Sequence, residues 1–421
     1  MQKFSKENLR IKTFKLALIR DTELLLGCKV DEWLEIAVRN QVAEIELQGP
    51  VNYKLPRFLF CAKSLTHLDC DNVEIPYYEA LDLVSLESLV LRHNVVIEER
   101  MLFHIVSSCL NLKDLCISFC SGFKNLVIPR HSKLEYLYIE GDVPVDGGKV
   151  ILETSSLATF DCNINGKNDP WPIISNRGLL RNLRHLFVTR LPITGEDLAK
   201  LVPELTSLEK LMFIGCDMLT SIQIPHPQLK QICFYECDNN LLNVVIDAPN
   251  LNKFKFRGKI RPPLSITIHS QASCTINIRT KARYLDTDGF FKLKKLLKGL
   301  NSCNVLKIFL SGRHNIKFDE KKSGNAELGP PCDIGELVLN MSRWKLSSSS
   351  LSAFLNGLFW TCHPPIISLR IYPYLYALIV EPLVNNLVEM VKCLEHPLKR
   401  IEVEETNNDS DFLHVQLRLC W

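Results

Sequence analysis

The amino-acid sequence predicts an α/β repeat protein, and three observations support that prediction. A pattern of the form apolar-x-x-apolar-x-apolar recurs nine times between residues 65 and 256. Its first anchors lie 21 to 26 residues apart, within the range of about 20 to 29 residues for leucine-rich repeats. In five copies, Asn or Cys stands three residues after the last anchor. Together they predict a leucine-rich-repeat solenoid, a horseshoe with a parallel concave sheet and irregular helices and loops on the convex side.

Each copy of the pattern supplies three apolar anchors, and the first anchors set the spacing. The nine copies are Leu65/Leu68/Cys70, Leu86/Leu89/Leu91, Leu112/Leu115/Ile117, Leu134/Leu137/Ile139, Leu157/Phe160/Cys162, Leu183/Leu186/Val188, Leu208/Leu211/Phe213, Leu229/Ile232/Phe234 and Leu251/Phe254/Phe256. One such pattern occurs by chance in many chains, but nine in phase do not. A repeat array also explains how 421 residues form one core, because each repeat contacts only its neighbours.

The composition excludes several classes of protein. A hydrophobic fraction of 46% argues against disorder, and a net charge of +3 argues against a dedicated nucleic-acid binder. Met1–Arg10 has no apolar signal core, and no run of about 18 apolar residues indicates a membrane span. The 16 cysteines are therefore expected to be reduced thiols in the cytoplasm or nucleus.

The Asn and Cys positions after the strands are expected to be structural. At the inward turn, a buried small polar side chain can pair with backbone groups that the turn leaves unsatisfied. These positions are Asn94, Cys120, Asn165, Cys216 and Cys237. Cys116 with Cys120, and Cys233 with Cys237, lack a second pair at zinc-site spacing, so we expect no metal and no cofactor.

The connectors between strands are expected to vary in structure. Periodic apolar residues predict a helix over Glu98–Ser108, and Thr194–Asp197 resembles a capping box that opens a helix ended by Pro203. The shortest connectors have room only for a loop or a 3₁₀ turn. Longer helices are expected at Asp288–Leu300, Ser349–Trp360 and Val384–Leu394.

Both ends of the chain extend the pattern more weakly. The additional anchor sets are Ile11/Phe14/Leu16, Val42/Ile45/Leu47, Val305/Ile308/Leu310, Ile334/Leu337/Leu339, Ile366/Leu369/Ile371 and Leu398/Ile401/Val403. Regularity breaks at Gly258–Ser270, which includes Arg261-Pro262-Pro263 and is interpreted as a hinge. We therefore expect a repeat array over residues 1–260, and its continuation with longer helical repeats over residues 261–421.

Four segments go beyond a generic repeat. They are Val30–Arg39, Tyr53–Leu65, Ser107–Leu115 and Phe354–Pro364. Together they resemble the repeat region of plant F-box/leucine-rich-repeat (FBD-like) proteins over most of residues 9–405. The resemblance implies that the repeats capture a target protein. It also implies recruitment by a Skp-type adaptor and a cullin, but only through an F-box of about 45 residues that residues 1–8 are too short to supply.

Alternation of side chains along each strand predicts the binding surface. The anchors face the core, so the residues around the last two anchors face the concave side. This rule places large apolar groups there at Tyr136, Tyr138, Phe187, Met212 and Tyr235, with a basic row at Lys253, Lys255 and Arg257. It also selects His67, Asp69, Asp71, Glu140, Thr159, Asp161, Asn163, His185, Thr189, Lys210, Ile214, Gln231 and Cys233. We expect an aromatic patch that binds a target protein with an acidic segment; the alternative is a mixed, solvated face.

A second basic cluster is interpreted differently. Arg279, Lys281 and Arg283 lie near a strand end, and Lys292, Lys294, Lys295 and Lys298 recur along the expected helix. Phe290, Leu293 and Leu297 form the apolar side of that helix. The cluster is therefore expected to be a solvated face, and a nuclear address is the weaker alternative.

Three classes of function compete. A protein-binding module, the substrate-recognition part of an SCF-type ubiquitin ligase receptor if an F-box is present, fits best. An enzyme is not expected, because none of the common nucleotide, hydrolase or metalloprotease motifs is present. The remaining alternatives are an adaptor-independent interaction protein and a small-molecule sensor of the same architecture. The sensor would need a deep pocket over the concave face.

Overall fold

A computed structural model describes most of the chain. The described residues are 11–18, 25–130, 133–141, 149–164, 177–237, 241–259, 264–281, 284–300, 302–312, 316–319, 329–344, 348–372, 379–381, 383–385, 400–409 and 412–420. They form two compact units. Unit 1 comprises Met1–Ile193 with Lys200–Glu209, and unit 2 comprises Thr194–Ala199 with Lys210–Trp421. Asn165 and most of the helix expected at Val384–Leu394 lie outside the described residues.

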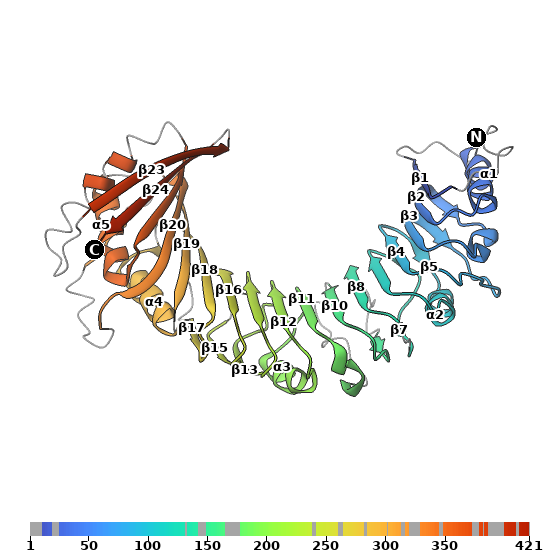
Figure 1. Ribbon diagram of the computed structural model, residues 1–421, viewed down its shortest axis with the longest axis horizontal. Helices are drawn as coiled ribbons and strands as arrows, with labels where there is room; N and C mark the ends of the chain where they lie inside the picture. Colours follow the sequence, from blue (N-terminus) through green and yellow to red (C-terminus); the bar gives the residue numbers. More distant parts are fainter. Residues whose placement is uncertain are drawn as a thin grey trace. The chain divides into compact units, whose positions relative to one another are not determined.

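Unit 1 contains a parallel sheet in which each repeat adds one strand beside the last (Figure 1). Its strands are β1 (Thr13–Ala17), β2 (Glu44–Lys54), β3 (His67–Ile75), β4 (Ser88–Arg92), β6 (Asp114–Ser118), β8 (Tyr136–Gly141), β10 (Thr159–Ile164) and β11 (His185–Thr189). The second anchors are aligned in register, with Leu89 paired to Leu115 and Leu137 to Phe160. All four are buried, so one apolar row continues from strand to strand.

Short helices and strands connect the repeats of unit 1. They are α1 (Leu25–Arg39), η1 (Arg57–Cys61), β5 (Val96–Ile97), α2 (Glu99–Ser108), β7 (Leu126–Ile128), β9 (Val150–Leu152) and η2 (Arg177–Asn182). Helix α2 confirms the prediction at residues 98–108 and buries Met101, Leu102, Ile105 and Val106. Strands β7 and β9 pair in parallel, so the prediction that the short connectors contain only loops or 3₁₀ turns is wrong.

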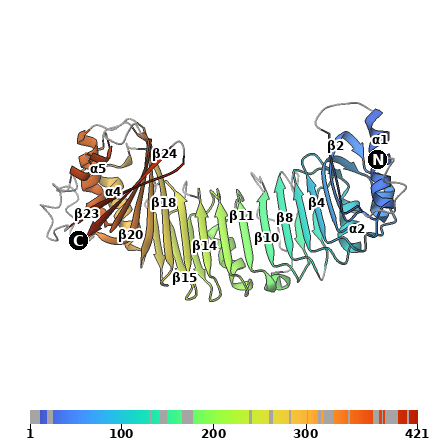
Figure 2. The ribbon, with the colours of Figure 1, turned by 45° about the horizontal axis from the view of Figure 1, so that its top comes forward.

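Unit 2 has the same construction (Figure 2). Its parallel strands are β12 (Lys210–Ile214), β14 (Gln231–Tyr235), β16 (Lys253–Gly258), β18 (Ser273–Lys281), β19 (Cys303–Gly312), β20 (Cys332–Trp344) and β22 (Ile366–Ile371). The sheet ends in an antiparallel pair, β24 (Phe412–Cys420) beside β22 and then β23 (Arg400–Asp409). The expectation of a further parallel repeat at Leu398/Ile401/Val403 is therefore wrong, and Val403 is exposed.

Helix α3 (Gly195–Leu201) has residues in both units, and η3 (Val202–Glu204) belongs to unit 1. The connectors of unit 2 are β13 (Ser221–Pro225), β15 (Asn243–Asp247), β17 (Ser265–Ile268), α4 (Thr287–Lys298), α5 (Ser348–Thr361) and β21 (Cys362–His363). Three of these, β13, β15 and β17, form a second parallel sheet. Helices α4 and α5 confirm two of the predicted helices, and Phe290 packs on Phe354 at 6.2 Å between ring centroids.

The capping box at the start of α3 forms as expected, with Asp in place of Glu. Thr194 Oγ1 accepts a hydrogen bond from Asp197 N at 3.2 Å, and the Asp197 carboxylate accepts one from Thr194 N at 3.0 Å. Two backbone donors at the helix start are thus satisfied. Gly195 lies between them because a Cβ there would come within 1.9 Å of Ser221 O.

The turns after the strands use Cys and Asn in different ways. Cys120, Cys216 and Cys237 are buried, and their thiols donate to the backbone carbonyls two residues before them at 3.4 to 3.7 Å. The buried structural role is therefore confirmed for these three cysteines. Asn94 is instead exposed with φ of +60°, so it serves the turn through its left-handed backbone, which Asn tolerates better than most residues.

The repeat register continues across the segment interpreted as a hinge. Lys253–Gly258 pairs with Ser273–Ile278 in unbroken register, and β17 joins the connector sheet. The two compact units divide between Ile193 and Lys210 rather than near residue 260. The expected boundary at residue 260 stays a prediction, while the fold class, an α/β leucine-rich-repeat solenoid, is confirmed.

A stack of aromatic rings forms the core of unit 2 and yields a test of the packing. Phe213 and Phe234 stack at 5.3 Å between centroids, Phe254 follows at 6.3 Å, and all three are fully buried. Replacing Phe234 with Ala removes the middle ring. We expect a loss of about 3 to 5 kcal/mol in the free energy of unfolding, measured by urea denaturation followed by circular dichroism.

Met218→Ala is the matched control, because Met218 belongs to the same unit and is 53% exposed. It is expected to change the free energy of unfolding by less than about 0.5 kcal/mol. Equal losses in the two variants would contradict the assignment of the ring stack to the core.

Candidate functional site

In each unit, the described connectors lie on one face of the parallel sheet (Figures 1 and 2), and we call the opposite face the open face. Its side chains alternate with the buried anchors, as in β8, where Tyr136, Tyr138 and Glu140 are half-buried between buried Leu137 and Ile139. The alternation rule used on the sequence is thus confirmed. Cys233 is an exception: it points to the open face but is fully buried, and Gln231 Nε2 donates to its sulfur at 3.3 Å.

The predicted site residues are divided between the two units. Unit 1 holds Tyr136, Tyr138 and Phe187, while unit 2 holds Met212, Tyr235, Lys253, Lys255 and Arg257. All the aromatic members and Met212 are half-buried rather than fully exposed. They are therefore described as two separate candidate surfaces.

On unit 1, the predicted aromatic residues Tyr138 and Phe187 lie on either side of the acidic residue Asp161. Asp161 on β10 is in register with Tyr138 on β8 and with Phe187 on β11. Burial raises the pKa of Tyr138, and the hydrogen bond that its hydroxyl donates to Glu140 at 2.7 Å raises it further. Tyr138 therefore stays a neutral donor at physiological pH.

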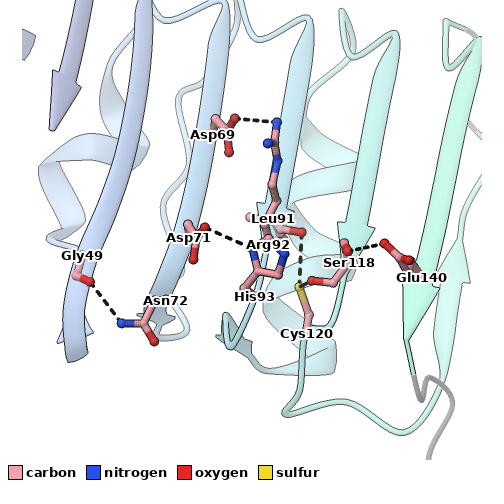
Figure 3. A network of polar contacts seen from close by, with 10 residues as sticks. All are labelled: Gly49, Asp69, Asp71, Asn72, Leu91, Arg92, His93, Ser118, Cys120 and Glu140. Carbon is pink, nitrogen blue, oxygen red and sulfur yellow. Dashed lines mark hydrogen bonds and ion pairs between the residues drawn. The ribbon is translucent and has the colours of Figure 1, made fainter. Parts of the chain in front are cut away.

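A polar network that the sequence analysis did not single out covers the same face. Glu140 accepts hydrogen bonds from Ser118 Oγ, Tyr138 OH and Asn163 Nδ2 at 2.7 to 2.8 Å. Figure 3 shows its Ser118 contact together with the Arg92–Asp69 ion pair at 2.8 Å and the His93–Asp71 contact at 3.1 Å. Except for Tyr138 and Glu140, which share β8, the partners in each contact come from different repeats, so the sheet register brings them together.

An exposed aromatic at the end of β6 was also missed. Phe119 has φ of +51°, is 44% exposed and stacks on His93 at 6.1 Å between ring centroids. It stands between the last anchor and the turn cysteine, outside the alternating strand positions. The left-handed backbone conformation of Phe119, rather than its place in the repeat motif, exposes its side chain.

The open face of unit 2 is basic. Six cations lie on β16, β18 and β19 at alternating positions: Lys253, Lys255, Arg257, Arg279, Lys281 and Lys307. The first three are the predicted row, and Lys255 and Arg257 are in register with Thr275 and Asn277 of β18. Tyr235 is in register with Arg257, so the predicted aromatic and basic residues do meet at this point.

Arg279 and Lys281 thus belong to the open face, whereas Lys292, Lys294, Lys295 and Lys298 lie on α4 among the connectors. The interpretation of these residues as a solvated face is wrong for Lys294, and Arg283 lies outside the described residues. Lys294 is only 2% exposed, its Nζ lies 4.0 Å from the ring centroid of Trp360, and burial lowers its pKa. The cation-π contact partly replaces the lost hydration.

Sites for small ligands or metals were sought in the described residues. A cavity of about 170 Å³ beside α2 and β7 is lined by Glu99, Arg100, Leu102, Phe103, Asn125 and Val127. It lies among the connectors and not on the open face, where a small-molecule sensor would need its pocket. Within the described ranges, no three acidic, His or Cys side chains are grouped to hold a metal ion, and no helix is long and apolar enough to cross a membrane.

The environment of Asp161 predicts a pH-dependent stability. Burial, aided by the negative charge of Glu140, raises the pKa of Asp161 to about 6. The folded state therefore holds a proton more tightly than the unfolded state, and stability falls as the pH rises from about 4 to about 6. Asp161→Asn removes this loss, so its urea midpoint should exceed that of the wild type at pH 7.5 and approach it at pH 4.5.

Glu153→Gln is the control for this substitution, because Glu153 is an exposed carboxylate of the same unit. Its urea midpoint should follow the wild type at both pH values. An Asp161→Asn variant less stable than the wild type at pH 7.5 would show that the charged form is stabilised in the fold.

Comparison with known proteins agrees with this architecture. The profile of the At1g61320/AtMIF1 leucine-rich-repeat domain matches residues 1–146 and 172–304. An FBD-associated F-box protein of Arabidopsis thaliana, At5g22730, is 27% identical over 176 residues, which cover 38% of this chain and 37% of the relative. The chain thus matches little more than a third of that relative's length. With two thirds of its residues matched, the chain belongs to the At1g61320/AtMIF1 leucine-rich-repeat domain family, which confirms the predicted relation to plant F-box/leucine-rich-repeat proteins.

Proposed function

We propose that this protein captures a target protein through the basic open face of unit 2, and that the target presents an acidic segment there. The leucine-rich-repeat domain is a protein-interaction module, so the open question is what its surface selects. The observation that carries the proposal is the unbalanced charge of the six cations on β16, β18 and β19. Lys253, Lys255, Lys281 and Lys307 make no ion pair or hydrogen bond through their ammonium groups with any described residue.

Such a surface favours an acidic partner for a physical reason. Cations at diagonal positions of neighbouring strands, such as Arg257 and Arg279, repel one another, because neighbouring strands are about 5 Å apart. A partner carboxylate relieves that repulsion and steers the encounter of the two proteins. Tyr235 and Met212 beside the row supply apolar contact area, which gives the surface a means of selecting shape as well as charge.

In this proposal the chain acts as the substrate-recognition part of a ubiquitin ligase receptor, in the cytoplasm or nucleus. The support is the family relation and the name of the F-box relative. An F-box joined to the chain would bind a Skp-type adaptor and a cullin, and the repeats would hold the target. We propose no catalytic role.

Charge reversal tests the proposed surface. The variant Lys253→Glu with Lys255→Glu should weaken binding of a fluorescein-labelled decaglutamate peptide by about tenfold, measured by fluorescence anisotropy at low salt. Lys295→Glu with Lys298→Glu on α4 is the matched control, because it reverses the same number of charges at exposed sites of the same unit, and it should bind the peptide almost like the wild type. Equal effects of both variants would mean that net charge, not this row, attracts the peptide.

The ligase role has its own test. Fused to an F-box, the chain should co-purify with a Skp-type adaptor and a cullin, while the unfused chain should not. The fusion that carries Lys253→Glu and Lys255→Glu should keep the adaptor but lose the decaglutamate peptide. Adaptor binding by the unfused chain would refute the proposal that an F-box supplies this contact.

A further inference from the structure

Two arginines on the open face of unit 2 converge on one carboxylate oxygen. Arg257 at the end of β16 places Nη2 3.3 Å from Glu236 Oε1, and Arg279 on β18 places Nη1 3.6 Å from the same atom. Glu236 follows β14 with φ of +58°, and its backbone N–H donates to Arg257 O at 2.7 Å. Three successive strands thus build one anion-binding position.

The carboxylate of Glu236 fills this position poorly. Charge-assisted hydrogen bonds between N–H donors and carboxylates are about 2.7 to 2.9 Å long, and both contacts here are longer. Both guanidinium groups share one oxygen, and the Glu236 side chain is 56% exposed. Arg257 Nε is shielded from solvent and has no hydrogen-bond partner among the described residues. Donor capacity therefore remains unused.

We propose that Arg257 and Arg279 bind the phosphate group of a phosphorylated serine or threonine in the target, and that Glu236 occupies the site until the phosphate displaces it. This inference rests on the proposed function, because it specifies the acidic segment that the basic face takes.

A phosphate monoester matches the site better than a carboxylate does. It carries a charge of about −1.5 to −2 at neutral pH and three acceptor oxygens, so each guanidinium can pair with its own oxygen. Lys307 is in register with Asn277, which is in register with Arg257 and stands two residues before Arg279, and the ammonium group of Lys307 has no partner among the described residues. Arg279 also lies 5.8 Å from the ring centroid of Phe309, which limits the orientations of its guanidinium plane.

Glu236 makes binding at this site depend on the charge of the ligand, because the ligand must displace the Glu236 carboxylate. A target residue with a single negative charge must compete with a tethered carboxylate of equal charge. A dianion gains more from the two arginines than Glu236 does, and the exposed Glu236 side chain can turn toward solvent. The site is therefore expected to select phosphoserine or phosphothreonine over glutamate.

Three labelled peptides test this selection with the full chain, by fluorescence anisotropy. They share two glutamates on each side of a central residue, which is phosphoserine, glutamate or serine. The wild-type protein should bind the phosphoserine peptide about tenfold more tightly than the glutamate peptide. Equal affinities for these two peptides would overturn the inference, as would tighter binding of a single-stranded oligothymidylate than of the phosphoserine peptide.

Substitutions at the site test which residues cause the preference for phosphoserine. Arg257→Gln with Arg279→Gln should abolish the preference for phosphoserine, whereas Glu236→Gln should strengthen phosphoserine binding severalfold by removing the competing charge. Arg181→Gln with Arg184→Gln is the matched control, because it neutralises two exposed arginines of unit 1, and it should keep the wild-type preference. A preference that survives the double arginine variant would overturn the inference, as would weaker phosphoserine binding by Glu236→Gln.

The outcomes separate this inference from the proposed function. Binding of the glutamate peptide that depends on Lys253 and Lys255, without preference for phosphoserine, would refute the phosphate site and leave the acidic-partner surface intact. Binding of the phosphoserine peptide that depends on Arg257 and Arg279, without any effect of Lys253→Glu with Lys255→Glu, would support the phosphate site and refute the wider surface.

Discussion

The parallel register between neighbouring repeats is the constraint on which the rest of this structure depends. Each strand buries its second and third anchors, and each anchor packs on the same anchor of the next repeat, as Leu89, Leu115 and Leu137 do. Because strand side chains alternate, burying the anchors forces every second residue onto the open face. A slip of one residue would expose the apolar row and bury charges such as Asp69 and Lys255. The core therefore determines which residues are available for recognition.

The same constraint explains why the open faces of the two units differ in charge. In unit 1 the register gathers acids from successive strands, and these are Glu44, Glu46, Asp69, Asp71, Asp114, Glu140 and Asp161. Part of that charge is compensated within the sheet, by Arg92 for Asp69 and by three donors for Glu140. In unit 2 the register gathers cations, and Glu236 is the carboxylate that pairs with Arg257 and Arg279 among the described residues. Uncompensated charge on an ordered sheet is costly for the free protein, and a partner of opposite charge can relieve it.

The connectors follow weaker rules than the strands do. Capping residues and apolar periodicity predicted α2, α3, α4 and α5, because helix ends need local partners that can be recognised in the sequence. The short connectors form strands such as β13, β15 and β17 because stacked repeats place them beside one another, where they can share backbone hydrogen bonds. That pairing is between segments more than 20 residues apart, so no local sequence pattern predicts it. Lys294 shows the same limit: its periodic position suggested solvent, but Trp360 of another helix covers it.

The sequence by itself determined the repeat, the anchors, the strand face and the family, because each depends on periodicity within about 25 residues or on local motifs. It also selected Tyr138, Phe187, Tyr235, Lys253, Lys255 and Arg257 as open-face residues. Only the tertiary structure decided which of these residues are neighbours, because that depends on which strands share a compact unit. It assigned the predicted residues to two compact units and brought Glu236, Arg257 and Arg279 together from three repeats. Such convergence arises from register between distant segments, and a one-dimensional pattern does not contain it.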